Sequence, residues 1–349
     1  MKRFLALFLT LSLVLSGCVI YLPAWEEETR TGALGDLTVH FIDVGQADCA
    51  LIDYQGQYLL IDGGNREDGQ LVVSYLEQQG VEELAAVICT HAHEDHVGGL
   101  PSVLAVYPTA AVYAPTKTYS SNIFDKFLYY TDQQGLEVTI PAPGDEITLG
   151  TVTGTFLGPV QSYADTNNTS LVLRLEFGDT AFLFTGDMET DAESDMLDYW
   201  GDENPLFSCD VLKVGHHGSN TSSGYRLLNA VDADYGVISV GTDNSYGHPH
   251  KEPMARFRQA EMTILRTDEL GHVLAHSDGS TITFTWENQS ATPTYAQPGE
   301  SMTYIGNKSS RKFHGPDCKN LPKENNQILF DSYQAAIEAG YSPCGACLG

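Results

Sequence analysis

The densest group of chemically active side chains in this sequence is the segment HAHEDH at residues 91–96, directly after the apolar run AAVICT. Imidazole nitrogens and carboxylate oxygens suit borderline divalent ions such as zinc and manganese. A strand end is rigid, so a tight turn after it can aim alternate side chains at two neighbouring points. The pattern predicts a metal site, and three unrelated histidines on a polar surface loop are the alternative that we disfavour.

The elements that must position this turn alternate between strands and helices. Strand-like runs begin at Leu37 with LTVHFIDV, DCALIDY and QYLLIDGG. Further strands are predicted for residues 85–90, 111–113, 151–157, 170–177, 181–185, 210–214, 235–240 and 281–286, and helices for residues 71–79, 191–199 and 253–259. Such alternation indicates a layered α/β domain.

The metal-binding segment resembles the signature H-x-H-x-D-H of the metallo-β-lactamase superfamily. Four residues complete that signature: His91, His93, Asp95 and His96. The phrases DVGQ, IDGG, FTGD and LKVGHHGS surround it in the family's order, so the resemblance covers residues 37–287. It implies an αββα sandwich with the site at the sheet edges, a metal-bridging Asp187 and a last histidine ligand in the segment GHHG.

Within that superfamily the chain is similar to the metallo-β-lactamase-like domain of ComEC-type DNA-uptake proteins and their free-standing relatives. The similarity rests on DVGQ, on NNTS at residues 167–170, on LKVGHHGS and on YGHPH at residues 246–250. Ala47 stands where that group usually has glycine. The resemblance implies a phosphodiester substrate, with DNA as the first to consider.

The ligand set contains two choices that the sequence leaves open. We expect His216 to be the ligand, because it comes first after the strand LKV, and His217 to point the other way into the substrate cleft. Many superfamily members supply a histidine between the motif and the bridging aspartate, but none lies between His96 and Asp187. Asn167 is a candidate neutral replacement. We therefore expect two divalent ions, zinc or manganese, with the first position weak.

Catalysis at such a site uses a metal-activated water, because a divalent ion lowers the pKa of bound water from about 15.7 to about 7. We expect Asp187 and Asp95 to be catalytic, the first by bridging the ions and the second by orienting the nucleophile. His248, in a Gly-His-Pro turn, could donate a proton to the leaving group or serve only the turn.

Hydrogen-bond donors follow the last histidines in the segment GSNTSS. Donors beside a metal suit a cluster of negatively charged oxygens, although a plain polar loop is equally compatible with this segment. The predicted substrate-binding residues are His217, Ser219, Thr221 and Ser222.

The C-terminus carries a second set of metal ligands with the pattern H-x3-C…C-x2-C. Its members are His314, Cys318, Cys344 and Cys347. About 45 residues make a small core, so a structural zinc ion is physically sensible. The segment resembles the Ada-type zinc-binding module, which uses four cysteines. A histidine in one position implies a structural site without methyl transfer. A disulfide is the alternative.

Charge is distributed unevenly along the 349 residues, with 46 acidic and 18 basic residues and a net charge of −28. Such a balance disfavours tight nonspecific binding to nucleic acid. The segment from Tyr304 to Lys323 is locally basic and could dock a polyanion, although a solvated charged face is an equal alternative. Its basic residues are Lys308, Arg311, Lys312, Lys319 and Lys323.

The N-terminus has the pattern of an export signal. Lys2 and Arg3 precede an apolar run at residues 4–15, which ends in LSGC and resembles a bacterial lipobox. We predict lipidation of Cys18 and a location on the extracellular face of the membrane, with an ordinary signal peptide as the alternative. The predicted organisation is signal peptide 1–17, tether 18–36, hydrolase domain 37–288, linker 289–303 and zinc-binding module 304–349.

These observations favour a membrane-anchored, extracellular, metal-dependent phosphodiesterase or nuclease acting on DNA. A phosphodiesterase acting on cell-wall polymers, such as phosphorylcholine groups on teichoic acids, is the rival enzyme. A binding lipoprotein with a partial metal site is the non-enzymatic alternative. No obligate protein partner is inferred.

Overall fold

The first sheet supplies the strand that leads into the metal-binding segment. The computed structural model describes residues 35–294, 303–315, 318–331, 333–345 and 347. The strand order of this sheet is β15-β14-β1-β2-β3-β4-β5-β6. Its strands are β1 (Leu37–Phe41), β2 (Ala50–Tyr54), β3 (Gln57–Ile61), β4 (Ala86–Ile88), β5 (Val112–Tyr113), β6 (Val138–Thr139), β14 (Val273–Ser277) and β15 (Ile282–Trp286).

The second sheet supplies the strands that carry the later ligands. Its order is β13-β12-β11-β10-β9-β8-β7, and strands β10 to β13 run parallel. Because parallel strands end at the same edge, the segments that follow β10 and β11 are brought together. The strands are β7 (Glu146–Leu149), β8 (Val152–Gly158), β9 (Val172–Phe177), β10 (Thr180–Phe184), β11 (Val211–Lys213), β12 (Tyr235–Ile238) and β13 (Thr263–Arg266).

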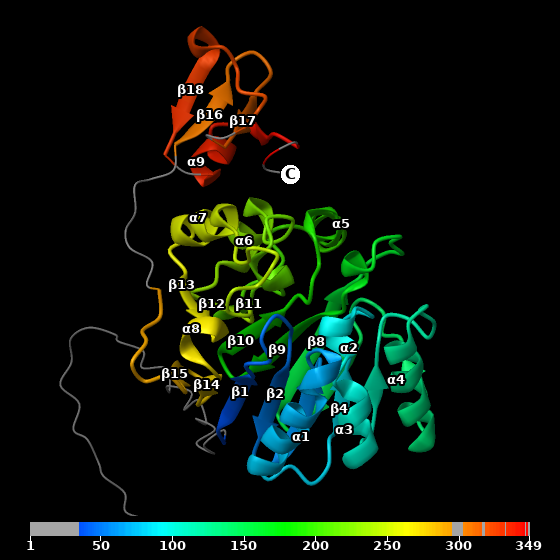
Figure 1. The fold of residues 1–349 in the computed structure, drawn as a ribbon. Helices are drawn as coiled ribbons and strands as arrows, with labels where there is room; N and C mark the ends of the chain where they lie inside the picture. Colours follow the sequence, from blue (N-terminus) through cyan, green and yellow to red (C-terminus); the bar gives the residue numbers. More distant parts are fainter. Residues whose placement is uncertain (1–34, 295–302, 316–317, 332, 346, 348–349) are drawn as a thin grey trace, which may run out of the picture. The chain divides into compact units, whose positions relative to one another are not determined.

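Helices cover the outer face of each sheet (Figure 1). Those on the first sheet are α1 (Gly69–Gln78), α2 (Glu94–Val97), α3 (Leu100–Val106) and α4 (Asn122–Gln133). Those that follow strands of the second sheet are α5 (Thr190–Trp200), α6 (Tyr225–Val231), α7 (Lys251–Gln259) and α8 (Thr267–Leu270). Within the described residues, no helix combines the length and apolar character needed to cross a membrane.

Three apolar layers hold the sandwich together. In β10, Phe182 and Phe184 pack between the two sheets, while Ala181 and Leu183 face the outer helices. Successive side chains of a strand point to opposite faces, so a strand buried on both faces reads as a continuous apolar run. Burial of a large apolar side chain contributes about 1.5–3 kcal/mol. The αββα sandwich predicted from the sequence is confirmed.

The structure corrects the predicted boundary of this domain. A bridge pairs Ile264 with Thr294, and the indole nitrogen of Trp286 donates to the carbonyl oxygen of Ala291 at 3.2 Å. The predicted linker therefore begins too early, because these hydrogen bonds fix residues up to Thr294 on the sheet. The predicted signal peptide, Cys18 and the predicted tether up to residue 34 lie outside the described residues.

The C-terminal unit has its own small sheet, with order β18-β16-β17-β19. Its elements are β16 (Tyr304–Asn307), β17 (Lys312–His314), β18 (Gln327–Phe330), α9 (Tyr333–Glu338) and β19 (Ser342–Pro343). Aromatic side chains dominate its core, including Tyr304, Phe313 and Tyr341.

Candidate metal centre

Strand β4 and helix α2 bring the H-x-H-x-D-H side chains against Asp187. His91, in the turn between them, and His96, in α2, are both buried. The Nε2 atom of His96 lies 3.2 Å from Asp187 Oδ1, and Nε2 of His91 lies 3.9 Å from Asp187 Oδ2. His93 Nδ1 lies 3.1 Å from His91 Nε2. The two oxygens of one carboxylate thus face different histidines, as a bridging ligand requires.

The two consecutive histidines after β11 do not point in opposite directions. His216 (φ 50°, ψ 45°) and His217 (φ 52°, ψ 24°) both adopt left-handed backbone conformations, so the chain turns within two residues. Nε2 of His216 lies 3.6 Å from Asp187 Oδ2, and Nε2 of His217 lies 3.8 Å from Asp187 Oδ1. The expectation that His217 faces away from the metal site is therefore wrong.

The donor atoms divide into two groups, one at each oxygen of Asp187. Ligand atoms of Asp95, His96, Asp187 and His217 lie within 4.8 Å of one another. The predicted placement of His216 in this group is corrected, because His217 occupies that position. His216 instead lies at the Oδ2 oxygen, on the side of His91 and His93.

Hydrogen bonds fix the tautomers of three of these imidazoles. His96 Nδ1 lies 2.8 Å from Asp62 Oδ2, and His217 Nδ1 donates to the carbonyl oxygen of Ser239 at 2.9 Å. Thr221 Oγ1 donates to Glu189, so it accepts from His216 Nδ1 at 3.2 Å. With Nδ1 committed to these partners, Nε2 is the atom of each ring that would bind a metal ion.

Buried polar atoms at the centre test whether these residues fit a divalent ion. His96 Nε2, His217 Nε2 and Asp187 Oδ1 are buried and have no hydrogen-bond partner among the described residues. Burying such atoms unpaired is costly, and they face one another. A set of imidazole nitrogens and carboxylate oxygens is the donor chemistry of zinc and manganese. The residues fit such a centre.

Two buried carboxylates that the sequence analysis did not assign support the imidazoles. Asp62 also accepts from the backbone nitrogen and hydroxyl of Thr90, both at 2.7 Å. Asp48 lies 2.8 Å from Lys213 Nζ and 3.3 Å from His217 Nδ1. A carboxylate behind an imidazole fixes the ring and raises its basicity. The sequence signal for both was an aspartate next to an apolar strand, since Asp48 precedes β2 and Asp62 follows β3.

Charge is balanced closely inside this buried centre. Burial alone would raise the pKa of Asp187, but the charges of His96 and His217 outweigh burial and hold this pKa well below its usual range. Burial, reinforced by the neighbouring charge of His96, lowers the pKa of His91 well below its usual range. Asp187 is therefore an anion and His91 is neutral, which are the forms that bind metal ions.

The centre opens into a cavity of about 350 Å³. It is lined by Gln46, His93, Glu94, Asp95, Asn167, Asp187, His216, His217, Tyr246 and His248. Asn167 donates to Glu189 at 3.4 Å, and its buried Oδ1 has no partner among the described residues. Its predicted role as a weak ligand stays a prediction. Gln46, Glu94 and Tyr246 were not singled out from the sequence as site residues.

His248 lines the cavity, and its predicted catalytic role stays a prediction. The amide oxygen of Gln46 accepts from the backbone of Gly241, so its amide nitrogen donates to His248 Nδ1 at 3.2 Å. Burial, followed by the charges of His217 and His216, lowers the pKa of His248 to about 4. Its imidazole is neutral at pH 7 with the proton on Nε2. This arrangement suits a hydrogen bond to a substrate oxygen rather than release of a proton.

The predicted hydroxyl cradle after the histidines is not formed. Ser222 is buried and donates to the carbonyl oxygen of Met188 at 2.7 Å. Ser219 is also buried and bonds to Thr221 at 3.0 Å. None of these three side chains lines the described cavity. The substrate-binding prediction for Ser219, Thr221 and Ser222 is therefore corrected: the hydroxyls brace this loop and orient His216.

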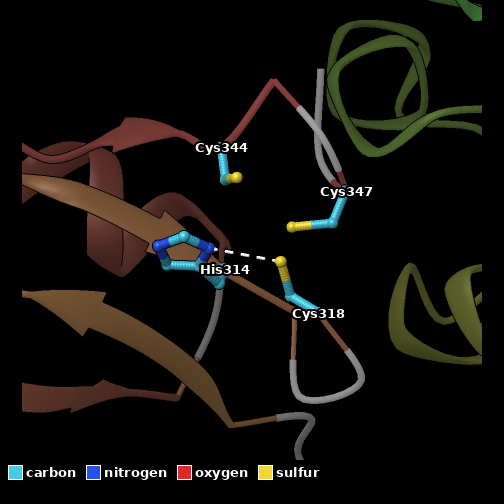
Figure 2. A group of neighbouring side chains, drawn as sticks. All are labelled: His314, Cys318, Cys344 and Cys347. Carbon is cyan, nitrogen blue, oxygen red and sulfur yellow. Dashed lines mark hydrogen bonds between the residues drawn. The ribbon is translucent and has the colours of Figure 1, made fainter. Parts of the chain in front are cut away.

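The C-terminal cluster brings together all four residues predicted for it. Ligand atoms of His314, Cys318, Cys344 and Cys347 lie within 4.8 Å of one another, and Figure 2 shows them pointing toward a common centre. His314 Nδ1 lies 3.3 Å from Cys318 Sγ. None of the described cysteines forms a disulfide. One imidazole and three thiols are a donor set that fits a tetrahedral zinc ion.

Comparison with known proteins supports both parts of the chain. Residues 42–242 match the metallo-beta-lactamase superfamily, and residues 298–348 match the metal binding domain of Ada. Since the first match covers more than half of its length, the chain belongs to the metallo-beta-lactamase superfamily.

The curated relatives include proteins named for competence. ComE operon protein 3 of Bacillus subtilis is 29% identical over 67% of this chain and 32% of its own length. Competence protein ComA of Neisseria gonorrhoeae is 31% identical over 74% of this chain and 34% of its own length. The chain thus spans about a third of these relatives.

Among solved structures, the chain is similar to the metallo-beta-lactamase fold protein YhfI from Bacillus subtilis. It is 16% identical, with a TM-score of 0.46, and the match covers 72% of this chain and 100% of that protein.

Proposed function

We propose that this chain is a metal-dependent phosphodiesterase that cleaves DNA on the extracellular face of a membrane, to which a lipid on Cys18 anchors it. The observation that carries the phosphodiesterase is the donor set divided between the two oxygens of Asp187, at the floor of an open cavity. Similarity to the competence protein ComA of Neisseria gonorrhoeae supports DNA as the substrate.

Two divalent ions at such a centre activate a water molecule and clamp the phosphoryl oxygens of a diester. His91, His93 and His216 would hold one ion, Asp95, His96 and His217 the other, and Asp187 both. The carboxylates of Asp62 and Asp48 keep two of the rings oriented. Nε2–H of His248 is a donor for a non-bridging oxygen of the substrate. Asn167 is a further candidate ligand.

A structural zinc ion held by the C-terminal cluster completes the proposal. Four protein ligands close a tetrahedral site, and a closed site stabilises a fold without offering a position to a substrate. The basic residues of this unit would then contact phosphates of a long substrate. Lys308 and Lys312 are exposed on or beside its strands.

The substrate is tested by incubating the purified, lipid-free chain with DNA, RNA, bis(p-nitrophenyl) phosphate and a phosphorylcholine diester, in Mn²⁺ and in Zn²⁺. Cleavage of DNA is the expected result, and Asp187→Asn is the inactive control. Cleavage of the small diesters without DNA would contradict the DNA substrate and favour a wall-polymer substrate. Absence of all four activities would favour a binding lipoprotein.

The anchor is tested separately. Cys18→Ala should move the protein from the membrane fraction to the medium or wash, since a lipid chain contributes about 0.8 kcal/mol per buried CH₂ group. Retention of this variant on the membrane after a high-salt wash would contradict the lipid anchor.

A further inference from the structure

A second groove lies on the helical face of the first sheet. Its volume is about 360 Å³, and Arg66, Ser102, Lys126 and Tyr130 are among the residues that line it. Arg66 and Lys126 also line an adjoining hollow of about 320 Å³. The two hollows therefore share two cationic side chains.

These two cations are unusual in a strongly acidic domain. Residues 35–294 contain 38 acidic and ten basic side chains. Most of the basic ones are used internally, as Lys213 is by Asp48 and Arg226 by Asp198. Among residues 35–294, four basic side chains have neither an ion pair nor a hydrogen bond: Arg66, Lys126, Lys251 and Arg258. Two of these four share one groove, and Asp125 is the carboxylate that lines the adjoining hollow.

Helix α2 joins this groove to the metal cavity. Glu94 and Asp95, in its first turn, line the metal cavity, and Gly98, directly after it, lines the groove. A Cβ atom at Gly98 would lie only 2.3 Å from the backbone nitrogen of Arg66, so the Arg66 segment packs directly on this helix. Helix α4, which carries Lys126, also contacts α2. One turn of helix is about 5.4 Å long, so the groove and the metal cavity lie a short distance apart along α2.

We propose that this groove binds the phosphate backbone of a single-stranded nucleic acid whose neighbouring diester lies at the metal centre. Arg66 and Lys126 contact phosphates, and the half-buried ring of Tyr130 offers a surface for a base. A cationic groove with an aromatic ring is the usual design for such strands. The inference rests on the proposed function, because a substrate strand is what connects the two cavities.

The test uses the full chain and a double variant that carries both Arg66→Gln and Lys126→Gln. The single variant Arg258→Gln is the control. Arg258 is an exposed cation without an ion pair, like those it controls for. The KM for a 20-nucleotide single strand should rise about tenfold in the double variant, and the slope of log KM against log salt should fall by about 1.4. Turnover of bis(p-nitrophenyl) phosphate should be unchanged, because neither Arg66 nor Lys126 lines the metal cavity.

Three results would overturn the inference in distinguishable ways. If the double variant had the same KM for the strand as Arg258→Gln, the groove would not bind the substrate, but the proposed nuclease activity would stand. If the folded double variant lost turnover of the small diester, Arg66 and Lys126 would act on the reaction at the metal centre and not on binding of the strand. Failure of the unaltered chain to cleave the strand would overturn the proposed substrate and this groove together. Arg66→Glu with Lys126→Glu should raise KM further.

Discussion

The two metal-binding clusters of this chain differ in how the fold assembles them. The hydrolase cluster joins Asp95, Asp187 and His217, which come from segments far apart in the sequence and from both sheets. The C-terminal cluster lies between His314 and Cys347 in one small unit. The first opens into a cavity of about 350 Å³. In the second, four protein ligands complete a tetrahedral site and leave no position for a substrate.

The ligands of the two clusters therefore have different tasks. The open centre is carried by a sandwich with three apolar layers, so its geometry is set by the core and its ligands are available for chemistry. The closed cluster sits beside a core of a few aromatic side chains, so the ligands themselves must hold the unit together. Removal of a ligand should therefore cost activity in the first case and structure in the second.

The largest effect on activity is expected for Asp187→Asn. This change keeps the shape of the side chain but removes the charge that serves both groups of histidines. Turnover should fall by about a thousandfold or more, because a metal centre supplies several kcal/mol of transition-state stabilisation. Steady-state kinetics and metal content measure this, with circular dichroism as the folding control. Normal metal content with undiminished turnover would contradict the bridging role.

The largest effect on structure is expected for Cys344→Ser in the C-terminal unit. Structural zinc contributes on the order of 10 kcal/mol to small units of this kind, so this unit should unfold and one zinc ion should be lost. Turnover of bis(p-nitrophenyl) phosphate should be kept, since the sandwich has its own core. Zinc content, proteolysis and turnover are measured in one preparation. Loss of the small-diester activity would show that the two units depend on each other.

A finer test separates the two consecutive histidines of the open centre. His216→Gln should weaken the ion at the Oδ2 side of Asp187 at least tenfold, and His217→Gln the ion beside Asp95, because each imidazole faces one carboxylate oxygen. Metal titrations with Co²⁺ followed by absorption distinguish the two sites. If both variants lost the same ion, the division of the donors would be wrong.

Local spacing was enough to predict part of this site. Asp187 and the His216–His217 pair follow the neighbouring parallel strands β10 and β11, which end at one edge, so their meeting could be foreseen. The motif around His91 follows β4 in the other sheet, and its meeting with Asp187 was expected from the family resemblance. The orientation of His217 could not be predicted, because it depends on two left-handed residues that no neighbouring residue type announces. The roles of Asp48 and Asp62 depend on partners brought close only by folding.

The strands and helices also differ in how well the sequence predicts them. Strands buried on both faces, such as β10, are continuous apolar runs that the sequence displays directly. Helix α4 was missed, although Ser121 caps it by accepting from the backbone nitrogen of Ile123. Its polar residues broke the apolar pattern, and packing of Phe124 and Phe127 in the outer core decides the structure.

Acid sensitivity should also differ between the two regions. In the sandwich, burial, followed by the charges of His276 and His272, lowers the pKa of His40 to about 4. Between pH 4 and the ordinary value of 6.5 the unfolded chain binds a proton here and the folded chain does not. This histidine therefore makes the free energy of unfolding fall as the pH falls from 6.5 to 4, by up to about 1.4 kcal/mol per pH unit.

His40→Gln removes the titrating group from β1 without touching either metal cluster. Its free energy of unfolding in urea should depend less on pH between 4 and 6.5 than that of the unaltered chain, while acid release of zinc from the C-terminal unit should be unchanged. His276→Gln, on the neighbouring strand β14, is the matched control and should keep most of the dependence. An equal slope in His40→Gln and the unaltered chain would mean that acid acts on the sandwich through its metal ligands. Both regions would then lose stability to acid by the same route, release of metal.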